Sequence, residues 1–202
     1  MGPFPRLFSI KPTLKLKGRK FKGIRGFAGK PFHPPLTDIP ITAYVLAAIF
    51  DVISFVWFKR EPTSGVPADF FISATHALVA GGIVSIFTII TGFWDWLKST
   101  PRRTQVWRTA NWHMAVMLTM SILVAADILL RLAYWQTGVT QGADLAIMLL
   151  SVVCGLLVSF GAMYGGTLVY EYAFNVEMDF DHAYTESERD KEYPEEVPPE
   201  QQ

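Results

Sequence analysis

Four long apolar stretches, separated by short polar links, limit the folds open to this chain more than any other feature. The stretches cover residues 39–58, 70–97, 109–134 and 143–174. A helix needs ~20 residues to cross ~30 Å of hydrocarbon, so each stretch is long enough to span a membrane. Short links make consecutive helices antiparallel. The sequence therefore predicts an all-α integral membrane protein, an antiparallel bundle of four transmembrane helices.

The charged residues divide the chain into three regions. Net charge is zero, but nine of the 18 Lys and Arg residues precede Asp38, which is the first acidic residue. Eleven of the 18 Asp and Glu residues lie from Glu171 onward. We therefore expect a basic, disordered arm over residues 1–30, a transmembrane domain over 31–176 and an acidic, disordered tail over 177–202.

The distribution of basic residues also predicts the orientation in the membrane. The link at 98–108 contains four Lys and Arg residues, that at 59–69 contains two and that at 135–142 contains none. Because positively charged segments stay in the cytoplasm, both termini should be cytoplasmic, in the inner (plasma) membrane. The basic arm is expected to contact the lipid bilayer and its anionic headgroups. It has no aromatic pattern typical of nucleic-acid binding.

Small residues at every fourth position predict close helix packing. They occur in the stretches at 70–97 and 143–174, so these two helices are predicted to be the closest pair. The same faces would suit protein partners in a membrane complex or a homo-oligomer.

Three ionisable residues are predicted to lie deep in the outer half of the membrane, namely Asp51, His76 and Asp127. Ionisable groups in a membrane are costly and are often functional. A hydrogen bond between His76 and Asp51 is one reading. A local ion pair between Asp127 and Arg131, four residues apart, is another.

A second polar set is predicted at the cytoplasmic ends of all four helices. Its members are His33, Asp38, Asp95, Arg108, Asn111, His113, Tyr170 and Glu171. Asp38 also has an ordinary structural reading, as the residue that caps the first helix just before Pro40.

Two histidines of the inner set could bind haem b or a metal ion. His33 and His113 lie at the same predicted depth, whereas His76 and His113 differ by ~15 Å. A metal site of these two histidines with Asp38 or Asp95 is an alternative. Cys154 is the one cysteine, which excludes an internal disulfide and a cysteine-based zinc or iron–sulfur site within one chain.

The chain resembles a bacterial multi-pass membrane family known as domain of unknown function 2231, from about Lys30 to Val176. The resemblance rests on HP at 33–34, DIPI at 38–41, GFWDWL at 92–97, Arg108, His113 and GGTLVY at 165–170. The family pattern often has a second His-Pro pair, at the position of Lys30-Pro31, and a histidine at the position of Asp38. The resemblance implies a setting beside redox proteins, such as Rieske-type or cytochrome partners, without a settled activity.

Three functions follow as hypotheses. The first is an accessory or anchoring subunit in a respiratory or electron-transfer setting. The second is an electron carrier with haem b or a metal on His33 and His113. The third is a transporter of protons or solutes, suggested by ionisable residues at two depths. The sequence shows no nucleophile–base pair and no phosphate-binding loop, which argues against a hydrolase or transferase and makes catalytic residues unexpected.

Overall fold

The computed structural model describes residues 22–26, 30–136 and 141–176. Its four helices are α1 (His33–Arg60), α2 (Val66–Ser99), α3 (Gln105–Gln136) and α4 (Leu145–Tyr170). Each helix is long and apolar enough to cross a membrane. The prediction of an all-α, four-helix membrane bundle is confirmed. The predicted acidic tail and most of the predicted basic arm lie outside the described residues.

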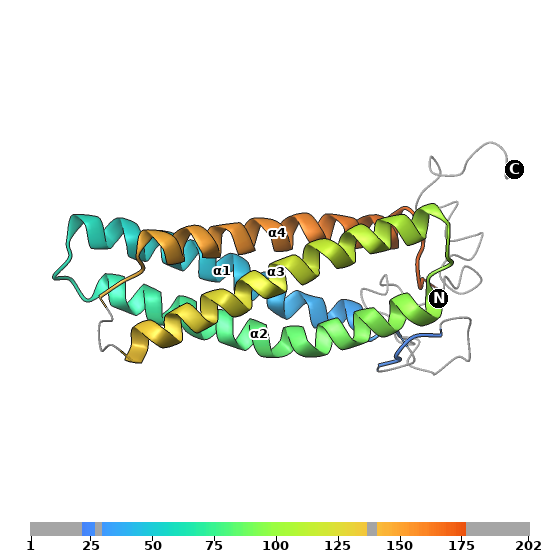
Figure 1. Cartoon of the computed structure of the whole chain (residues 1–202), viewed down its shortest axis with the longest axis horizontal. Coiled ribbons are helices and arrows are strands. Elements are labelled where there is room, and N and C mark those ends of the chain that lie inside the picture. Colours follow the sequence, from blue (N-terminus) through green and yellow to red (C-terminus); the bar gives the residue numbers. More distant parts are fainter. Residues whose placement is uncertain (1–21, 27–29, 137–140, 177–202) are drawn as a thin grey trace, which may run out of the picture.

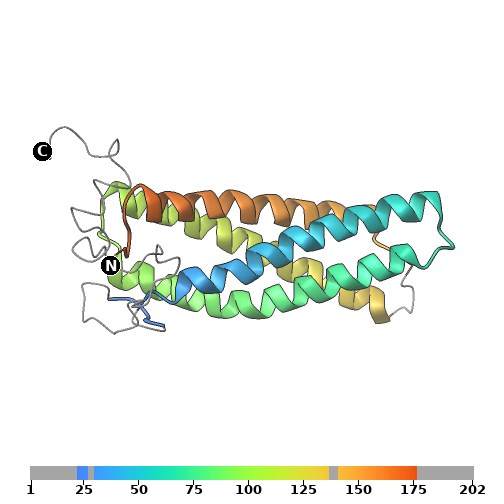
Figure 2. The same ribbon diagram turned by 180° about the vertical axis from the view of Figure 1, so that it is seen from behind.

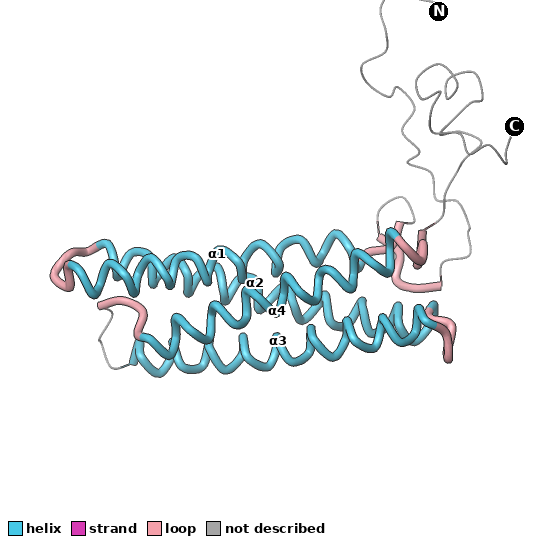
Figure 3. The backbone as a smooth tube through the Cα atoms, turned by 90° about the horizontal axis from the view of Figure 1, so that it is seen from above, coloured by secondary structure: helices cyan, strands magenta, loops and turns pink. Residues whose placement is uncertain are grey.

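The four helices run side by side along one long axis, with neighbours in the sequence antiparallel (Figures 1 and 3). α1 packs against α2 and α4, and α3 packs mainly against α4. α2 and α3 make the sparsest contact of the neighbouring pairs. The start of α1, the α2–α3 loop and the end of α4 share one end of the bundle (Figure 2). We call this the inner end and the opposite one the outer end.

The first helix begins earlier than the hydropathy predicts. α1 starts at His33, with Phe32 at the N-cap and prolines in its first turn. Asp38 is exposed inside the helix, so its predicted role as N-cap is wrong. Pro34 and Pro35 explain the difference, because proline at the first helical positions has a suitable φ and needs no hydrogen-bond acceptor.

The small residues do not bring α2 and α4 together, because these helices lie diagonally across the bundle. An added Cβ at Gly81 of α2 would lie 2.8 Å from the Ala43 Cβ of α1. An added Cβ at Gly155 of α4 would lie 3.1 Å from the Ala48 Cβ, also of α1. The prediction of a close α2–α4 pair is therefore wrong. Small residues on α2 and on α4 instead allow α1, which lies between these two helices, to pack closely against each of them.

A buried apolar layer occupies the middle of the bundle. It contains Tyr44 and Ala47 of α1, Leu78 of α2, Met120 of α3 and Cys154 of α4. Large apolar side chains such as Ile83, Phe87, Ile122, Leu156 and Met163 point outward and are exposed. An apolar exterior around an apolar centre is the arrangement of a helix bundle in lipid, so the chain is a multi-pass membrane protein.

Candidate functional site

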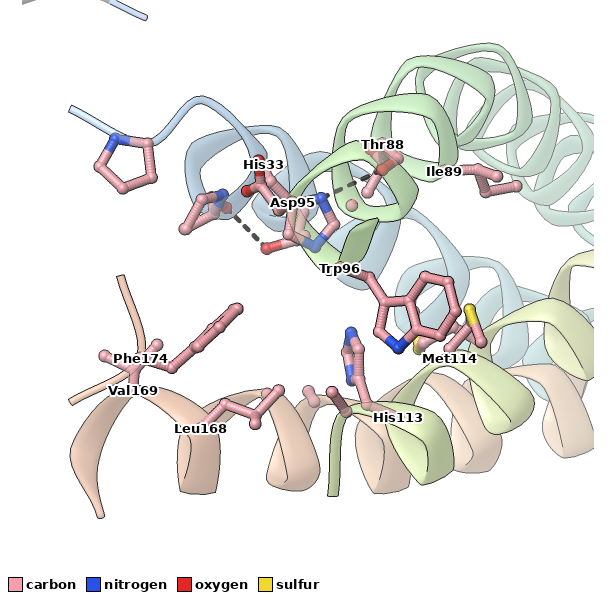
Figure 4. A pocket seen from close by; sticks show the side chains of 18 of the residues that line it. His33, Thr88, Ile89, Asp95, Trp96, His113, Met114, Leu168, Val169 and Phe174 are labelled. Carbon is pink, nitrogen blue, oxygen red and sulfur yellow. Dashed lines mark hydrogen bonds between the residues drawn. The ribbon is translucent and has the colours of Figure 1, made fainter. Parts of the chain in front are cut away.

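Two histidines face each other across the inner half of the bundle. His33 is the first residue of α1, and His113 lies about two turns into α3. Their ring centroids are 6.5 Å apart and their planes are nearly perpendicular, at 84°. Figure 4 shows both rings pointing into the space between the helices. The predicted proximity of these two residues is thus present in the structure.

Hydrogen bonds to helix carbonyls fix the orientation of both rings. His33 Nδ1 lies 3.0 Å from the Thr88 carbonyl oxygen of α2. His113 Nδ1 lies 2.9 Å from the Gly161 carbonyl oxygen of α4. A carbonyl oxygen only accepts, so each Nδ1 carries the proton and donates it. Each Nε2 therefore keeps its lone pair, as in histidines that bind metals.

Glycines make room for these rings. An added Cβ at Gly92 of α2 would lie 2.6 Å from His33 Cε1. An added Cβ at Gly165 of α4 would lie 3.4 Å from His113 Cε1, an ordinary contact. Gly92 is thus required for the position of His33, whereas Gly165 leaves more space.

The histidines line a cavity of about 690 Å³, and residues from all four helices contribute to its walls. This volume is in the usual range for small-molecule and cofactor sites. Most of the lining is apolar, including Ile41, Ile89, Phe93, Met114, Met117, Leu118 and Leu168. The cavity therefore suits a largely apolar ligand that also offers a partner for two imidazole nitrogens.

A polar patch lies at the inner end of the same cavity. Lys30, Asp38, Asp95 and Thr100 are among its lining residues. Asp95 Oδ1 accepts a hydrogen bond of 3.1 Å from the Ile24 N–H, which joins the described part of the arm to α2. The buried Thr100 hydroxyl has no hydrogen-bond partner among the described residues. The same oxygen has almost no accessible surface, so it is not presented to the cavity.

The other predicted inner residues have different positions. Tyr170 touches the cavity but is 89% exposed. Asn111 does not line the cavity and accepts a 2.8 Å hydrogen bond from the Trp96 indole, which joins α3 to α2. Arg108 and Glu171 are exposed and do not line the cavity.

No group of three His, Cys, Asp or Glu side chains in the described part of the chain is arranged to hold a metal ion. The predicted site of two histidines plus Asp38 or Asp95 is therefore not formed by the side chains as they stand. Within residues 22–26, 30–136 and 141–176, the two imidazoles have no third His, Cys, Asp or Glu ligand beside them.

The outer polar residues form a separate buried cluster near the other end. Asp51 and Asp127 meet through Arg131, and all three are at most 1% exposed. The predicted Asp127–Arg131 pair is confirmed, with Nε 2.9 Å from Oδ1. His76 is exposed on α2, and the buried partners of Asp51 are Arg131 and Ser151 instead.

The comparisons with known proteins agree with the sequence motifs. A family model described as a predicted membrane protein, DUF2231, matches residues 29–178. The chain belongs to the DUF2231 family. No curated protein and no solved structure matches it. The DUF2231 match includes both histidines and every residue of the cavity, so the candidate site lies wholly inside the family's domain.

Sequence reasoning found the two histidines of this DUF2231 protein but missed the residues that hold them. Thr88 and Gly161 act through main-chain carbonyls, which carry no side-chain signal. It also missed Thr75 and Ser151 in the outer cluster, because hydroxyl residues are common in membrane helices. A signal for Ser151 was available, since it belongs to the small-residue face of the fourth span.

Proposed function

We propose that this DUF2231 protein is a small membrane electron carrier that binds haem b between His33 and His113. The observation that carries the proposal is the pair of imidazole rings that line one cavity, each with Nδ1 bonded to a carbonyl and Nε2 left as an acceptor (Figure 4). An iron ion held by both Nε2 atoms at about 2 Å would place the ring centroids about 6 Å apart. The separation of 6.5 Å in the structure is close to that value.

The ligand count supports haem over a bare metal ion. His33 and His113 would supply two imidazole ligands to an iron whose other four ligands come from a porphyrin. A bare zinc ion would need four ligands from the protein or water. Bundle cores commonly hold such groups between facing helices.

The cavity also suits both the apolar ring of a haem and its carboxylate groups. The apolar lining would cover the porphyrin, and the inner end would receive its carboxylates. There Lys30 would supply a positive charge, although Asp38 and Asp95 line the same end. When bound, the iron would accept and release one electron while the protein keeps both axial ligands in place.

The setting we propose is a respiratory or electron-transfer complex in the inner (plasma) membrane, in which the protein is an accessory subunit. The α2–α3 loop is positively charged, with Arg102 and Arg103 exposed, which supports a cytoplasmic inner end. Partners would be other membrane subunits or a second copy of the chain. The transporter hypothesis stays a prediction.

An absorption spectrum of the full-length protein, produced with an ample haem supply, tests the proposal. We expect a Soret band and the sharp visible bands of low-spin bis-histidine haem on reduction. His33→Ala and His113→Ala should each abolish these low-spin bands, because each removes one axial ligand. His76→Ala is the matched control, since that histidine is exposed on α2 away from the cavity, and it should keep the spectrum.

A wild-type protein without a Soret band would overturn the proposal. So would low-spin bands that survive both ligand substitutions. Metal analysis of the same samples separates the alternatives, because a bare metal ion would give bound metal without any porphyrin absorbance.

A further inference from the structure

The seam between α2 and α3 is the least closely packed boundary between neighbouring helices, and both of these helices line the cavity. A hydrogen bond joins the two helices near each end of the seam. Near the inner end, Trp96 Nε1 donates to Asn111 Oδ1 at 2.8 Å. Near the outer end, Arg131 Nη1 donates to Thr75 Oγ1 at 3.0 Å. Thr75 and Trp96 are about 30 Å apart along α2, so a long stretch of seam lies between the two bonds.

Along this stretch, residues that line the cavity also belong to the outward faces of the two helices. Phe93 of α2 lines the cavity and is 50% exposed, and it continues the outward stripe of Ile86 and Ile90. Leu118 of α3 lines the cavity and is 42% exposed, one turn from the outward-facing Ile122. Residues three, four or seven positions apart share one face of a helix. The cavity wall therefore continues onto the lipid-facing surface at the seam.

This part of the seam lies at the depth of the hydrocarbon. Ile89 of α2 lines the cavity too, and Ile89 and Leu118 are each about 10 Å along the helix from the Trp96–Asn111 bond. They are therefore at the same level in the antiparallel pair. Leu118 is about 4 Å and Ile89 about 10 Å from the midpoint of its helix, within the ~15 Å half-thickness of a hydrocarbon layer. A molecule that enters here must come from the lipid phase.

The inner end is a less suitable entrance for an apolar ligand. Lys30, Asp38 and Asp95 make the cavity polar at this end. The arm is also bonded to α2 there, because the Ile24 N–H donates to Asp95 Oδ1. Phe174, which follows α4, lines the cavity at the same end (Figure 4). A largely apolar molecule entering from water would have to pass these groups, whereas the seam offers an apolar path.

We propose that the seam between α2 and α3 is a lateral opening through which the cavity takes up haem from the lipid phase. A porphyrin ring is flat and largely apolar, so haem dissolves in a bilayer and can pass edge-on between two helices. Ile89, Phe93 and Leu118 would line this path. The Trp96–Asn111 bond limits how far the helices separate at the inner end. The identity of the ligand rests on the proposed function, whereas the opening itself does not.

Haem uptake by the full-length protein from haem-loaded liposomes tests the path. Leu118→Trp adds bulk at the seam and should slow uptake by about tenfold, because an obstructed path lowers the association rate. It should also slow the release of haem to an acceptor protein, since both directions use one path. Ile122→Trp is the matched control, because Ile122 lies on the next turn of the same face and outside the cavity, and it should leave both rates unchanged. Asn111→Ala removes the bond at the inner end of the seam and should speed both rates.

A second readout needs no haem. An aryl diazirine dissolved in the bilayer labels, on illumination, the residues that it touches. Met117 lines the cavity, and its Sδ packs toward Gly161 of α4. In haem-free, full-length protein the probe should label Met117, and Leu118→Trp should lower this labelling severalfold. Met163 of α4 is 69% exposed and lies outside the cavity, so it is the internal reference and should be labelled equally in both proteins.

Unchanged uptake in Leu118→Trp would overturn the proposal. Faster release of haem from this variant would also overturn it, because the tryptophan would then fill the cavity and not obstruct a path. Labelling of Met117 that is absent, or that Leu118→Trp leaves unchanged, would show that the probe does not enter by the seam. A wild-type protein that never binds haem would overturn the proposed function instead, and the labelling of Met117 would still decide whether the seam is open.

Discussion

Gly92 of α2 limits where the His33 ring can lie. A methyl group at this position would be 2.6 Å from His33 Cε1 and 3.1 Å from its Nε2. The ring is held by its bond to Thr88, so it can move only by losing that bond or its position in the cavity. We expect Gly92→Ala to weaken haem retention by at least tenfold, measured by haem transfer to a soluble acceptor protein.

Gly165→Ala is the natural control for this substitution. Its added methyl would meet His113 Cε1 at 3.4 Å, which is an ordinary contact. Haem retention in this variant should stay near that of the wild type. An equal loss of haem retention in the two variants would contradict the prediction, because it would show that the effect of Gly92→Ala does not depend on the His33 ring.

The relative orientation of the two imidazole rings makes a spectroscopic prediction. Their planes lie at 84° to each other. Perpendicular axial imidazoles leave two iron d orbitals nearly equal in energy, whereas parallel rings separate them. The oxidised protein should therefore give a low-spin electron paramagnetic resonance signal of the large-gmax type. A three-line rhombic spectrum would contradict the ring geometry.

The sequence predicted single residues well where depth alone decides their position. The rise of a helix per residue put His33 at the same depth as His113 and separated His113 from His76. Depth does not give the direction of a side chain around its helix, so His76 was assigned to a buried set although it is exposed. The same limit hid Ser151, whose direction places it between two aspartates.

At the scale of the helices, the contact between α1 and α2 depends on Gly81. An added Cβ would lie 2.8 Å from the Ala43 Cβ and 2.9 Å from Tyr44 Cε1. Tyr44 cannot move aside easily, because its hydroxyl is hydrogen-bonded to Ser85 at 2.7 Å. Gly81→Ala should lower the free energy of unfolding by about 1–3 kcal/mol, the usual cost of overpacking.

The neighbouring glycine provides the comparison. An added Cβ at Gly82 would meet only the flexible end of Ile128, at 3.1 Å. Gly82→Ala should therefore leave stability nearly unchanged in a detergent unfolding titration. A smaller loss for Gly81→Ala than for Gly82→Ala would contradict the packing described for α1 and α2.

The helices themselves were predictable from apolar length, but their neighbours were not. Small residues predict that a helix is approached closely without identifying which helix approaches it. In an antiparallel bundle with short links, α2 and α4 are both next to α1, and this connectivity decides the packing. The early start of α1 was also not predictable from hydropathy. Pro34 and Pro35 lie outside the apolar stretch, but the conformation of proline suits the first turn of a helix.

For the whole molecule, two polar sites lie on opposite sides of the apolar layer. His33 and Asp51 are both on α1, about 27 Å apart along the helix axis. The inner site has a cavity, whereas the outer cluster is closed and its charged groups are paired. This asymmetry supports the proposal of a ligand at the inner end, whereas Arg131 of the outer cluster connects all four helices.

The orientation of the bundle in the membrane can be tested by labelling single introduced cysteines. Cys154 is buried and fully covered, so it gives little background with a membrane-impermeant thiol reagent. A cysteine at the exposed Arg102 position reports on the inner end, and one at the exposed Glu61 position reports on the outer end. In intact cells we expect labelling of Glu61→Cys only, because the excess of basic residues should keep the α2–α3 loop in the cytoplasm. Both variants should react once the membrane is permeabilised. Labelling of Arg102→Cys in intact cells would place the inner end outside and would contradict the proposed exchange of electrons with cytoplasmic partners.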